Sequence, residues 1–327
     1  MKIYTHRAYG KPEEVITLQE VVKPQPVADQ VLLKVKAAPV NDYDWCVVRG
    51  KPFAYRLFFG LFRPKKRFQK LGMEIAGVVE ALGPDAGQFE VGEAVYGDTS
   101  DHAFGSLGEY LCVSEKALIR KPNAMSFEAA AAIPHAAMLA YEGLVDLGDI
   151  QDGQKILVNG AGGGMGTFAV QIAKQYNAEV TGVDSGDKFE MLRAQGFDHL
   201  IDYQQEDFTR RTEKYDLILD ARTGRSPFNI QRALKPGGKY VSVGGKTGRL
   251  LQMALLKGLI RLFTGKRFQM LALKPNQHLD QINQWYEAGM IKPVIDGPHP
   301  FDQVPQLIQY FGEARHKGKV VIAMDEG

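Results

Sequence analysis

A glycine-rich stretch in the middle of the chain has the residue types and the setting of a phosphate-binding loop. It follows a short apolar run at Lys155–Asn159 and precedes a run with helical apolar spacing at Thr167–Tyr176. The stretch contains Gly160, Gly163, Gly164, Met165 and Gly166. Glycine allows positive φ and a close approach of the backbone to a ligand, and a helix N-terminus presents free N–H groups to an anion. The spacing is G-x-x-G-x-x-G rather than G-x-G-x-x-G, but the strand–loop–helix setting predicts a site for a dinucleotide pyrophosphate.

A second group of polar residues follows the next predicted strand, Glu179–Val183. Asp184 ends this strand, where a carboxylate accepts hydrogen bonds from the adenosine ribose of NADH. Ser185 and Lys188 come directly after it, and a hydroxyl and an ammonium suit the 2′-phosphate of NADPH. The residues therefore do not decide whether the coenzyme is NADH or NADPH. The ordinary alternative for Lys188 is a solvated lysine in the first turn of a helix.

A parallel sheet would bring these two groups together, because the carboxyl ends of parallel strands meet at one edge. Downstream of Pro122, apolar runs alternate with helical patterns, which predicts such a sheet. The expected strands are Lys155–Asn159, Glu179–Val183, His199–Ile201, Tyr215–Leu219 and Lys239–Val243. The expected helices are one capped by Ser126 that runs through Ala132, Thr167–Tyr176, and Lys188–Gln195 closed by Gly196.

Upstream of Pro122, short β-branched runs separated by Gly and Pro predict an all-β unit. These runs are Val31–Val35, Ala76–Ala81, Ala94–Tyr96 and Glu109–Val113. The chain ends on a further predicted strand, Val320–Ala323. We therefore expect an α/β protein in which residues 1–122 and 265–327 form a β domain, and residues 123–264 form a doubly wound dinucleotide-binding domain.

Composition excludes several classes of protein. The 327 residues suffice for two domains, and 45% apolar with 24% charged residues is an ordinary globular balance. A net charge of +2 gives no reason to expect a nucleic-acid partner. No apolar run is long enough to span a bilayer, and Met1–Gly10 lacks the apolar core of a signal peptide, so we expect a cytoplasmic protein. Cys46 and Cys112 are too few for a disulfide framework or a four-cysteine zinc lobe.

Two segments combine basic and large apolar side chains. Lys51–Lys70 is rich in Lys, Arg and Phe, and Leu250–Phe268 is rich in Leu with interspersed Lys and Arg. The ordinary interpretation is a surface loop and a helix with solvated charges. A sharper hypothesis is peripheral contact with an anionic membrane beside the entrance for a lipophilic substrate.

At this point the sequence resembles a known family. The stretch Ile156–Asp202 carries V-N-G-A-G-G-G-M-G, Q-I-A-K, V-T-G-V and I-D-Y in the order found in zinc-independent quinone oxidoreductases of the medium-chain dehydrogenase/reductase superfamily. Further agreeing segments are Val40–Asp44, Arg49–Gly50, Leu71–Val79, Val91–Gly92 and Gly318–Ile322. The resemblance covers essentially the whole chain.

The resemblance implies a GroES-like β-barrel domain built from both termini, a Rossmann domain between them, and a homodimer. In NADPH-dependent members, a lysine at the position of Lys188 meets the 2′-phosphate, and a tyrosine at the position of Tyr203 packs near the adenosine. Asp184 departs from that pattern, since those members usually have a small neutral residue there. Gly244 and Gly245 match the family's glycines beside the nicotinamide.

The related zinc alcohol dehydrogenases indicate what the chain lacks. Where they place a ligand cysteine and a ligand histidine, this chain has Asn41 and Met73. An amide oxygen is a weak zinc ligand and a thioether a poor one, so we expect no catalytic zinc. Cys46 lies too far along the chain from Asn41 to replace the missing ligand, and its ordinary role is that of a small apolar filler.

By the same resemblance, Asn41, Tyr43, Asp44 and Trp45 border the reaction site. We assign Asn41 and Asp44 to catalysis, with an Asx turn and a backbone anchor as their respective structural alternatives. Tyr43 and Trp45 are assigned to the substrate pocket. His135 is a lone candidate for proton transfer, and its ordinary role is that of a packed histidine.

Without a metal, the acceptor has to stabilise the charge that hydride transfer creates on it. Quinones and α,β-unsaturated carbonyls delocalise that charge, whereas a simple alcohol needs a Lewis acid to lower its hydroxyl pKa. The sequence therefore predicts NADPH- or NADH-dependent reduction of a quinone, enone or enal. Two alternatives stay open: a metal-free alcohol dehydrogenase, and a nucleotide-binding regulator with little turnover.

Overall fold

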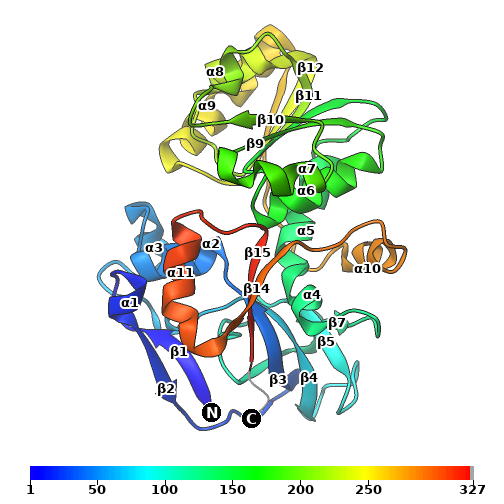
Figure 1. Ribbon diagram of the computed structural model, residues 1–327. Coiled ribbons are helices and arrows are strands. Elements are labelled where there is room, and N and C mark those ends of the chain that lie inside the picture. The colour runs from blue at the N-terminus through cyan, green and yellow to red at the C-terminus, as the bar shows by residue number, and fades with distance from the viewer. Residues whose placement is uncertain (325–327) are drawn as a thin grey trace. The chain divides into compact units, whose positions relative to one another are not determined.

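The computed structural model describes residues 1–324 and divides the chain into two compact units (Figure 1). The first unit contains Met1–His135, Pro275–Leu279 and the C-terminal segment from Val294; the second contains Ala136–Lys274 and Asp280–Pro293. A β unit assembled from both ends of the chain and an α/β unit between them match the predicted fold class. Of the domain predicted at 265–327, residues 325–327 lie outside the described residues.

The first unit is built on a largely antiparallel sheet in the order β14-β15-β3-β4-β5-β7, with β6 also paired to β3 and with a separate β1-β2 ribbon. Its strands are β1 Lys2–His6, β2 Ile16–Glu20, β3 Gln30–Pro39, β4 Glu74–Leu82, β5 Ala94–Asp98, β6 Tyr110–Ser114, β7 Ile119–Arg120, β14 Ile295–Pro300 and β15 Lys319–Ala323. Its helices are α1 Pro12–Val15, α2 Asp42–Arg49, α3 Arg56–Phe59, α4 Phe127–Ala132 and α11 Val304–Gly312. Close pairing of β3 with β4 requires Gly77, since a β-carbon there would lie 2.5 Å from the carbonyl oxygen of Lys34.

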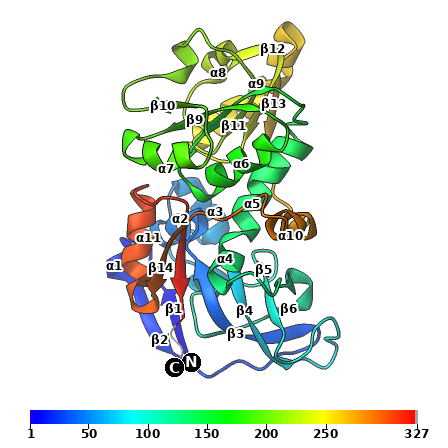
Figure 2. The same ribbon diagram turned by 45° about the vertical axis from the view of Figure 1, so that its right-hand side comes forward.

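The second unit is a six-stranded parallel sheet in the order β10-β9-β8-β11-β12-β13. Its strands are β8 Lys155–Asn159, β9 Glu179–Asp184, β10 His199–Asp202, β11 Tyr215–Asp220, β12 Leu234–Ser242 and β13 Arg267–Met270. Its helices are α6 Gly164–Lys174, α7 Phe189–Ala194, α8 Pro227–Ala233, α9 Thr247–Thr264 and α10 Leu279–Glu287, while α5 Pro134–Tyr141 contains the point of division. Helices α6 and α7 cover one face of the sheet and α8 and α9 the other, as right-handed crossovers require (Figure 1, Figure 2).

The two compact units divide the chain at other places than after residues 122 and 264, and the predicted domain boundaries stay predictions. The first unit continues past Pro122 to His135, because the buried alanines of α4 let this helix pack against β3, β4 and β15. The second unit continues past Thr264 to Lys274, because β13 pairs in parallel with β12. Neither the packing of α4 nor the pairing of β13 has a local sequence signal, since each depends on strands that lie elsewhere in the chain.

Strand ends gather at one edge of the sheet in the first unit. Strands β15 and β4 are both antiparallel to β3, so each begins beside the end of β3. Lys319 is the first residue of β15, Glu74 is the first residue of β4, and Asn41 follows the end of β3. Asp98, the last residue of β5, is the registered partner of Glu74. The topology therefore brings together four polar residues from widely separated parts of the sequence.

Candidate functional site

The amide of Asn41 is held in one orientation inside the first unit. Asn41 is the N-cap residue of α2 and only 4% exposed. Its Oδ1 accepts a hydrogen bond from Lys319 Nζ at 2.6 Å. An ammonium group only donates, so the amide atom that faces it is the oxygen. The other amide atom, Nδ2, is then a buried donor with no hydrogen-bond partner among the described residues, and is therefore available to donate to a ligand or a water molecule.

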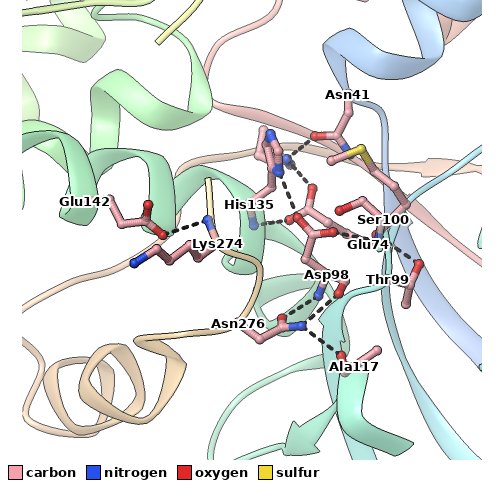
Figure 3. Close-up of polar contacts among 12 residues, drawn as sticks. Asn41, Glu74, Asp98, Thr99, Ser100, Ala117, His135, Glu142, Lys274 and Asn276 are labelled. Carbon is pink, nitrogen blue, oxygen red and sulfur yellow. Dashed lines mark hydrogen bonds and ion pairs between the residues drawn. The ribbon is translucent and has the colours of Figure 1, made fainter. Parts of the chain in front are cut away.

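Lys319 is itself fixed by a chain of polar contacts, whose members Asn41, Glu74, His135 and Asp98 are labelled in Figure 3. Its ammonium also donates to Glu74 Oε2, and Glu74 Oε1 accepts the backbone N–H of His135 at 2.7 Å. His135 Nδ1 lies 2.8 Å from Asp98 Oδ2. Burial is the largest single influence on the pKa of Asp98 and would raise it, but the hydrogen bond and charge of His135 and the hydrogen bonds from Ser100 together lower the pKa. The positive charge of Lys319 is thus neutralised by a rigid carboxylate, and Asn41 cannot turn its amide without breaking that arrangement.

Tyr43 contributes an apolar wall near the start of α2. Its ring stacks on Phe104 with centroids 4.3 Å apart and meets Phe59 edge-on. Its hydroxyl is a second buried polar group without a partner. Burial raises the pKa of this phenol well above its usual value, so Tyr43 is a poor proton donor. These contacts hold the ring of Tyr43 in an aromatic cluster, and its place in a substrate pocket stays a prediction.

The geometry favours the structural alternative for Asp44. Its Oδ1 accepts the backbone N–H of Gly72 at 2.7 Å and its Oδ2 that of Asn41 at 2.9 Å. The side chain is fully buried, and burial raises the pKa of the carboxyl to about 6, although the two backbone hydrogen bonds lower it. A pKa near 6 would suit proton transfer, but both oxygens are committed to the backbone. Asp44 therefore anchors the turn that presents Asn41.

Trp45 is packed on the other side of its helix. The ring lies against Gly312 of α11, where a β-carbon would come within 2.3 Å of it, and the guanidinium of Arg49 lies 4.5 Å from its centroid. These contacts account for Trp45 as a link between α2 and α11 and give no support to its predicted place in the substrate pocket.

The residues at this strand edge do not fit a zinc ion. Asn41 Oδ1 already accepts from the ammonium of Lys319, so a metal at that oxygen would face a second cation. Met73 is buried and offers only a thioether. Burial also raises the pKa of the Cys46 thiol, which disfavours the thiolate that zinc requires. Among residues 1–324, no group of three or more His, Cys, Asp or Glu side chains is arranged to hold a metal ion.

The glycine loop of the second unit has the form expected of a pyrophosphate site. Gly160 follows β8 with a φ of +89°, Gly163 is the N-cap of α6, and Gly164 begins that helix. A β-carbon at Gly166 would lie 2.4 Å from the carbonyl oxygen of Ala161, so only glycine allows the loop to pack this closely. The helix begins earlier than predicted and includes Met165 and Gly166, which leaves the free N–H groups of its first turn within the loop.

The residues predicted to bind the adenosine end lie together at the end of β9. Asp184 accepts the backbone N–H of Gly162 at 2.7 Å and that of Ser185 at 2.9 Å, and Lys188 Nζ lies 3.4 Å from its Oδ1. Lys188 is 3% exposed, so it is not the solvated lysine of the alternative interpretation. The backbone N–H of Tyr203 donates to the carbonyl of Asp184, while its side chain is half exposed. The residues that favour NADH and those that favour NADPH thus form one ion-paired cluster.

We expect replacement of Lys188 to separate the two coenzymes. If its ammonium reads the 2′-phosphate, Lys188→Ala weakens NADPH binding by about 10- to 150-fold, the value of one charge-assisted hydrogen bond. NADH binding then changes little, because NADH lacks that phosphate. Fluorescence titration with both coenzymes measures this, with Lys235→Ala as a control that removes an ion-paired lysine elsewhere in the same unit. Equal losses for both coenzymes would show that Lys188 does not read the phosphate.

Sequence reasoning missed a buried polar network at the same edge of the parallel sheet. Asp220, which ends β11, accepts from Asn159 Nδ2 at 2.7 Å and from the Tyr240 hydroxyl at 2.8 Å. Burial raises the pKa of Asp220 in spite of these donors. The chain reverses its direction of strand addition between β8 and β11, and ligands of doubly wound sheets bind at such a point. Two strand-end polar residues, Asn159 and Asp220, were the available signal.

Gly244 and Gly245 lie just beyond the end of β12. The carbonyl of Gly244 accepts the backbone N–H of Thr223 at 2.9 Å. Gly245 has a φ of +148°, and a β-carbon there would come within 2.5 Å of the Thr223 backbone. The loops after β11 and β12 therefore pack closely enough to require glycine, at the edge of the sheet that carries the glycine loop.

Comparison with known proteins agrees with this architecture. The model for the alcohol dehydrogenase GroES-like domain matches residues 27–123, and a model described as zinc-binding dehydrogenase matches residues 195–322. A 2-methylene-furan-3-one reductase of Solanum lycopersicum is 33% identical over 98% of this chain and 79% of its own length. A chloroplastic NADPH-dependent alkenal/one oxidoreductase of Arabidopsis thaliana is 32% identical over the same shares.

Solved structures give the same result over the whole chain. The CurK enoyl reductase superposes with a TM-score of 0.84 at 26% identity and covers 99% of both chains. The quinone oxidoreductase of Coxiella burnetii superposes with a TM-score of 0.84 at 25% identity, again over 99% of both chains.

Proposed function

The chain belongs to the medium-chain dehydrogenase/reductase superfamily, among its quinone oxidoreductase-like members, and from this premise we propose that it reduces a quinone or an α,β-unsaturated carbonyl with NADPH or NADH. Relatives named as alkenal/one oxidoreductase, quinone oxidoreductase and enoyl reductase support an enzyme of this class. The observation that carries the proposal within this chain is the amide of Asn41, whose free Nδ2 is oriented by Lys319.

Residues of the second unit are suited to hold the coenzyme. Gly164, Met165 and Gly166 in the first turn of α6 offer backbone N–H groups to the pyrophosphate, whereas those of residues 160–163 are already bonded within the protein. The ammonium of Lys188, which is paired with Asp184, is suited to the adenosine ribose or its phosphate. A bound reduced nicotinamide supplies the hydride. The protein supplies position and the electrostatic environment.

Residues of the first unit are suited to hold the acceptor. When hydride adds to an enone or a quinone, negative charge develops on the carbonyl oxygen, and a fixed donor at that oxygen stabilises the charge. Asn41 Nδ2 is such a donor, because Lys319 holds the other end of the amide and no protein group satisfies it. Lys319 acts as a positioning residue, because it fixes the orientation of the Asn41 amide while Glu74 neutralises its charge. The ring of Tyr43 supplies an apolar wall for a flat acceptor.

We expect the activity to be independent of zinc. The family model whose description includes zinc matches residues 195–322. By the resemblance to zinc alcohol dehydrogenases, two ligand positions are held here by Asn41 and Met73, outside that match, and Asn41 is bonded to an ammonium. Purified protein is therefore expected to contain no stoichiometric zinc, and EDTA is expected to leave turnover unchanged. Elemental analysis before and after chelation measures both. One zinc ion per chain, lost together with activity, would contradict the prediction.

A panel of acceptors tests the proposed reaction. Oxidation of NADPH and NADH is followed with 1,4-benzoquinone, 9,10-phenanthrenequinone and a series of 2-alkenals, and oxidation of secondary alcohols is assayed in the reverse direction. We expect turnover with the quinones and alkenals. Brisk oxidation of a secondary alcohol without reduction of either acceptor class would favour the metal-free alcohol dehydrogenase. Coenzyme binding without turnover across the panel would favour the nucleotide-binding regulator.

Two further expectations from the sequence stay predictions. They are a homodimer, which light scattering of the purified protein would test, and a cytoplasmic location. No helix within residues 1–324 is long and apolar enough to cross a membrane.

A further inference from the structure

Helix α9 presents a second apolar face that nothing in the described chain covers. One face packs on the sheet through the buried side chains of Met253 and Ile260. The opposite face carries large apolar side chains at helical spacing with high exposure. These are Leu251 (61%), Leu255 (72%), Leu259 (54%), Leu262 (76%) and Phe263 (79%). β-Carbons built at Gly248 and Gly258 would meet no atom within 4 Å, so the space over this face is open.

Helix α9 carries charged side chains of one sign only, although Arg225, Lys235 and Lys239 elsewhere in the unit are ion-paired with acids. No Asp or Glu occurs between Asp220 and Asp280, whereas Lys and Arg recur throughout that stretch. Lys257 and Arg261 lie on α9 itself and are exposed. With 18 residues, α9 is about 27 Å long. An amphipathic helix of this length with leucines on one side and only basic charge beside them is suited to lie in the headgroup region of an anionic bilayer.

Charge decides between the possible occupants of this face. In a symmetric pair of chains joined through α9, the basic side chains of both copies would face each other, and like charges oppose that contact. A nucleic acid would satisfy the basic side chains but leave the leucines exposed. An anionic lipid surface satisfies both, since phosphate headgroups meet Lys and Arg while the acyl region takes up the apolar side chains.

We propose that α9 is a peripheral membrane-binding helix that docks on bilayers containing anionic lipids. The docking would bring the protein to lipophilic quinones or lipid-derived alkenals, and this consequence rests on the proposed function. The segment Lys51–Lys70 of the first unit, whose organisation as short turns around α3 gives no continuous helical face, is not required for the proposal.

Co-sedimentation with vesicles tests the docking directly. We expect the protein to bind vesicles of phosphatidylcholine mixed with phosphatidylglycerol at low salt, and to bind weakly at high salt or to phosphatidylcholine alone. The double variant Leu255→Gln/Leu262→Gln keeps helix propensity and is expected to bind about tenfold less tightly or worse, since it withdraws two apolar anchors. The matched control Val22→Gln/Val91→Gln changes two exposed apolar side chains outside α9 (92% and 63% exposed) and is expected to bind as the native protein does.

Other results would overturn the proposal. They are a failure of the native protein to bind the anionic vesicles at low salt, and equal binding by the α9 variant. Conversion of a native dimer to a monomer by the α9 variant, with no vesicle binding, would assign the face to a second copy. Binding to duplex DNA in preference to the vesicles would assign the basic side chains of α9 to nucleic acid.

Activity assays separate this proposal from the proposed function. With a water-soluble quinone, the α9 variant is expected to turn over as the native protein does. With a long-chain quinone embedded in anionic vesicles, its rate is expected to fall about as much as its binding. Vesicle binding without turnover of either quinone would support the docking and contradict the proposed function.

Discussion

Replacing Lys319 by Met is expected to lower both the stability of the first unit and the rate of hydride transfer. The variant leaves Glu74 as a buried carboxylate without its counter-ion, and breaking a buried ion pair in this way costs about 3–5 kcal/mol of unfolding free energy. It also frees the amide of Asn41 to rotate and removes the nearby positive charge. We therefore expect kcat/KM to fall by about 10²- to 10³-fold, as for loss of an oxyanion donor. Denaturant unfolding and steady-state kinetics measure the two effects.

A double variant separates these two roles of Lys319. In Lys319→Met/Glu74→Gln both charges are removed, so most of the lost stability is expected to return, whereas the orientation of Asn41 is not restored. Lys319→Arg keeps the charge and a donor, and is expected to recover part of the activity. Recovery of full kcat/KM in the double variant would show that Lys319 serves only to neutralise Glu74.

Replacing Asn41 by Ala is expected to reduce catalysis without reducing stability. The change removes the donor that we assign to the acceptor oxygen, so kcat and kcat/KM are both expected to fall by about 10²- to 10³-fold while coenzyme affinity stays unchanged. It also removes Nδ2, a buried donor whose missing hydrogen bond costs about 1–3 kcal/mol, and this gain offsets the lost bond to Lys319. The melting temperature is therefore expected to change little.

The nearly isosteric variant Asn41→Asp provides the control for shape. A carboxylate keeps the contact with Lys319 and fills the same space, but it has no N–H to donate. We expect its melting temperature to equal or exceed that of the native protein, and its kcat/KM to be as low as that of Asn41→Ala. Near-native activity in Asn41→Asp would exclude hydrogen-bond donation as the role of this side chain.

The features that the sequence predicted well are local in the chain. The glycine loop, Asp184 and Lys188 lie within one strand–helix–strand segment, so spacing alone was enough to place them in one site. The periodicity of the apolar residues likewise identified most strands and the helix that follows the loop. The order of the apolar runs along the chain predicted the split β unit, whereas the family resemblance supplied Asn41, which no local pattern singles out.

The features that the sequence did not predict depend on distant pairing. Lys319 is 278 positions from Asn41 and 245 from Glu74, and only the antiparallel pairing of β15 and β4 with β3 brings the three together. The roles of Asp44 and Trp45 follow from contacts with Gly72 and Gly312, which a helix drawn from sequence alone cannot show. His135 was noted as a lone histidine, and its partner Asp98 becomes visible only in the sheet register.

Transfer of deuterium from coenzyme to product tests the central claim most directly. NADPH and NADH are each prepared in two forms, with deuterium on one or the other face of C4. Each form is incubated with a 2-alkenal, and the product is analysed by mass spectrometry and NMR. The account predicts a saturated aldehyde that carries one deuterium on the β-carbon, delivered from a single face of the coenzyme, at a rate that falls in Asn41→Ala. Deuterium on the carbonyl carbon of an allylic alcohol, or a product without deuterium, would contradict it.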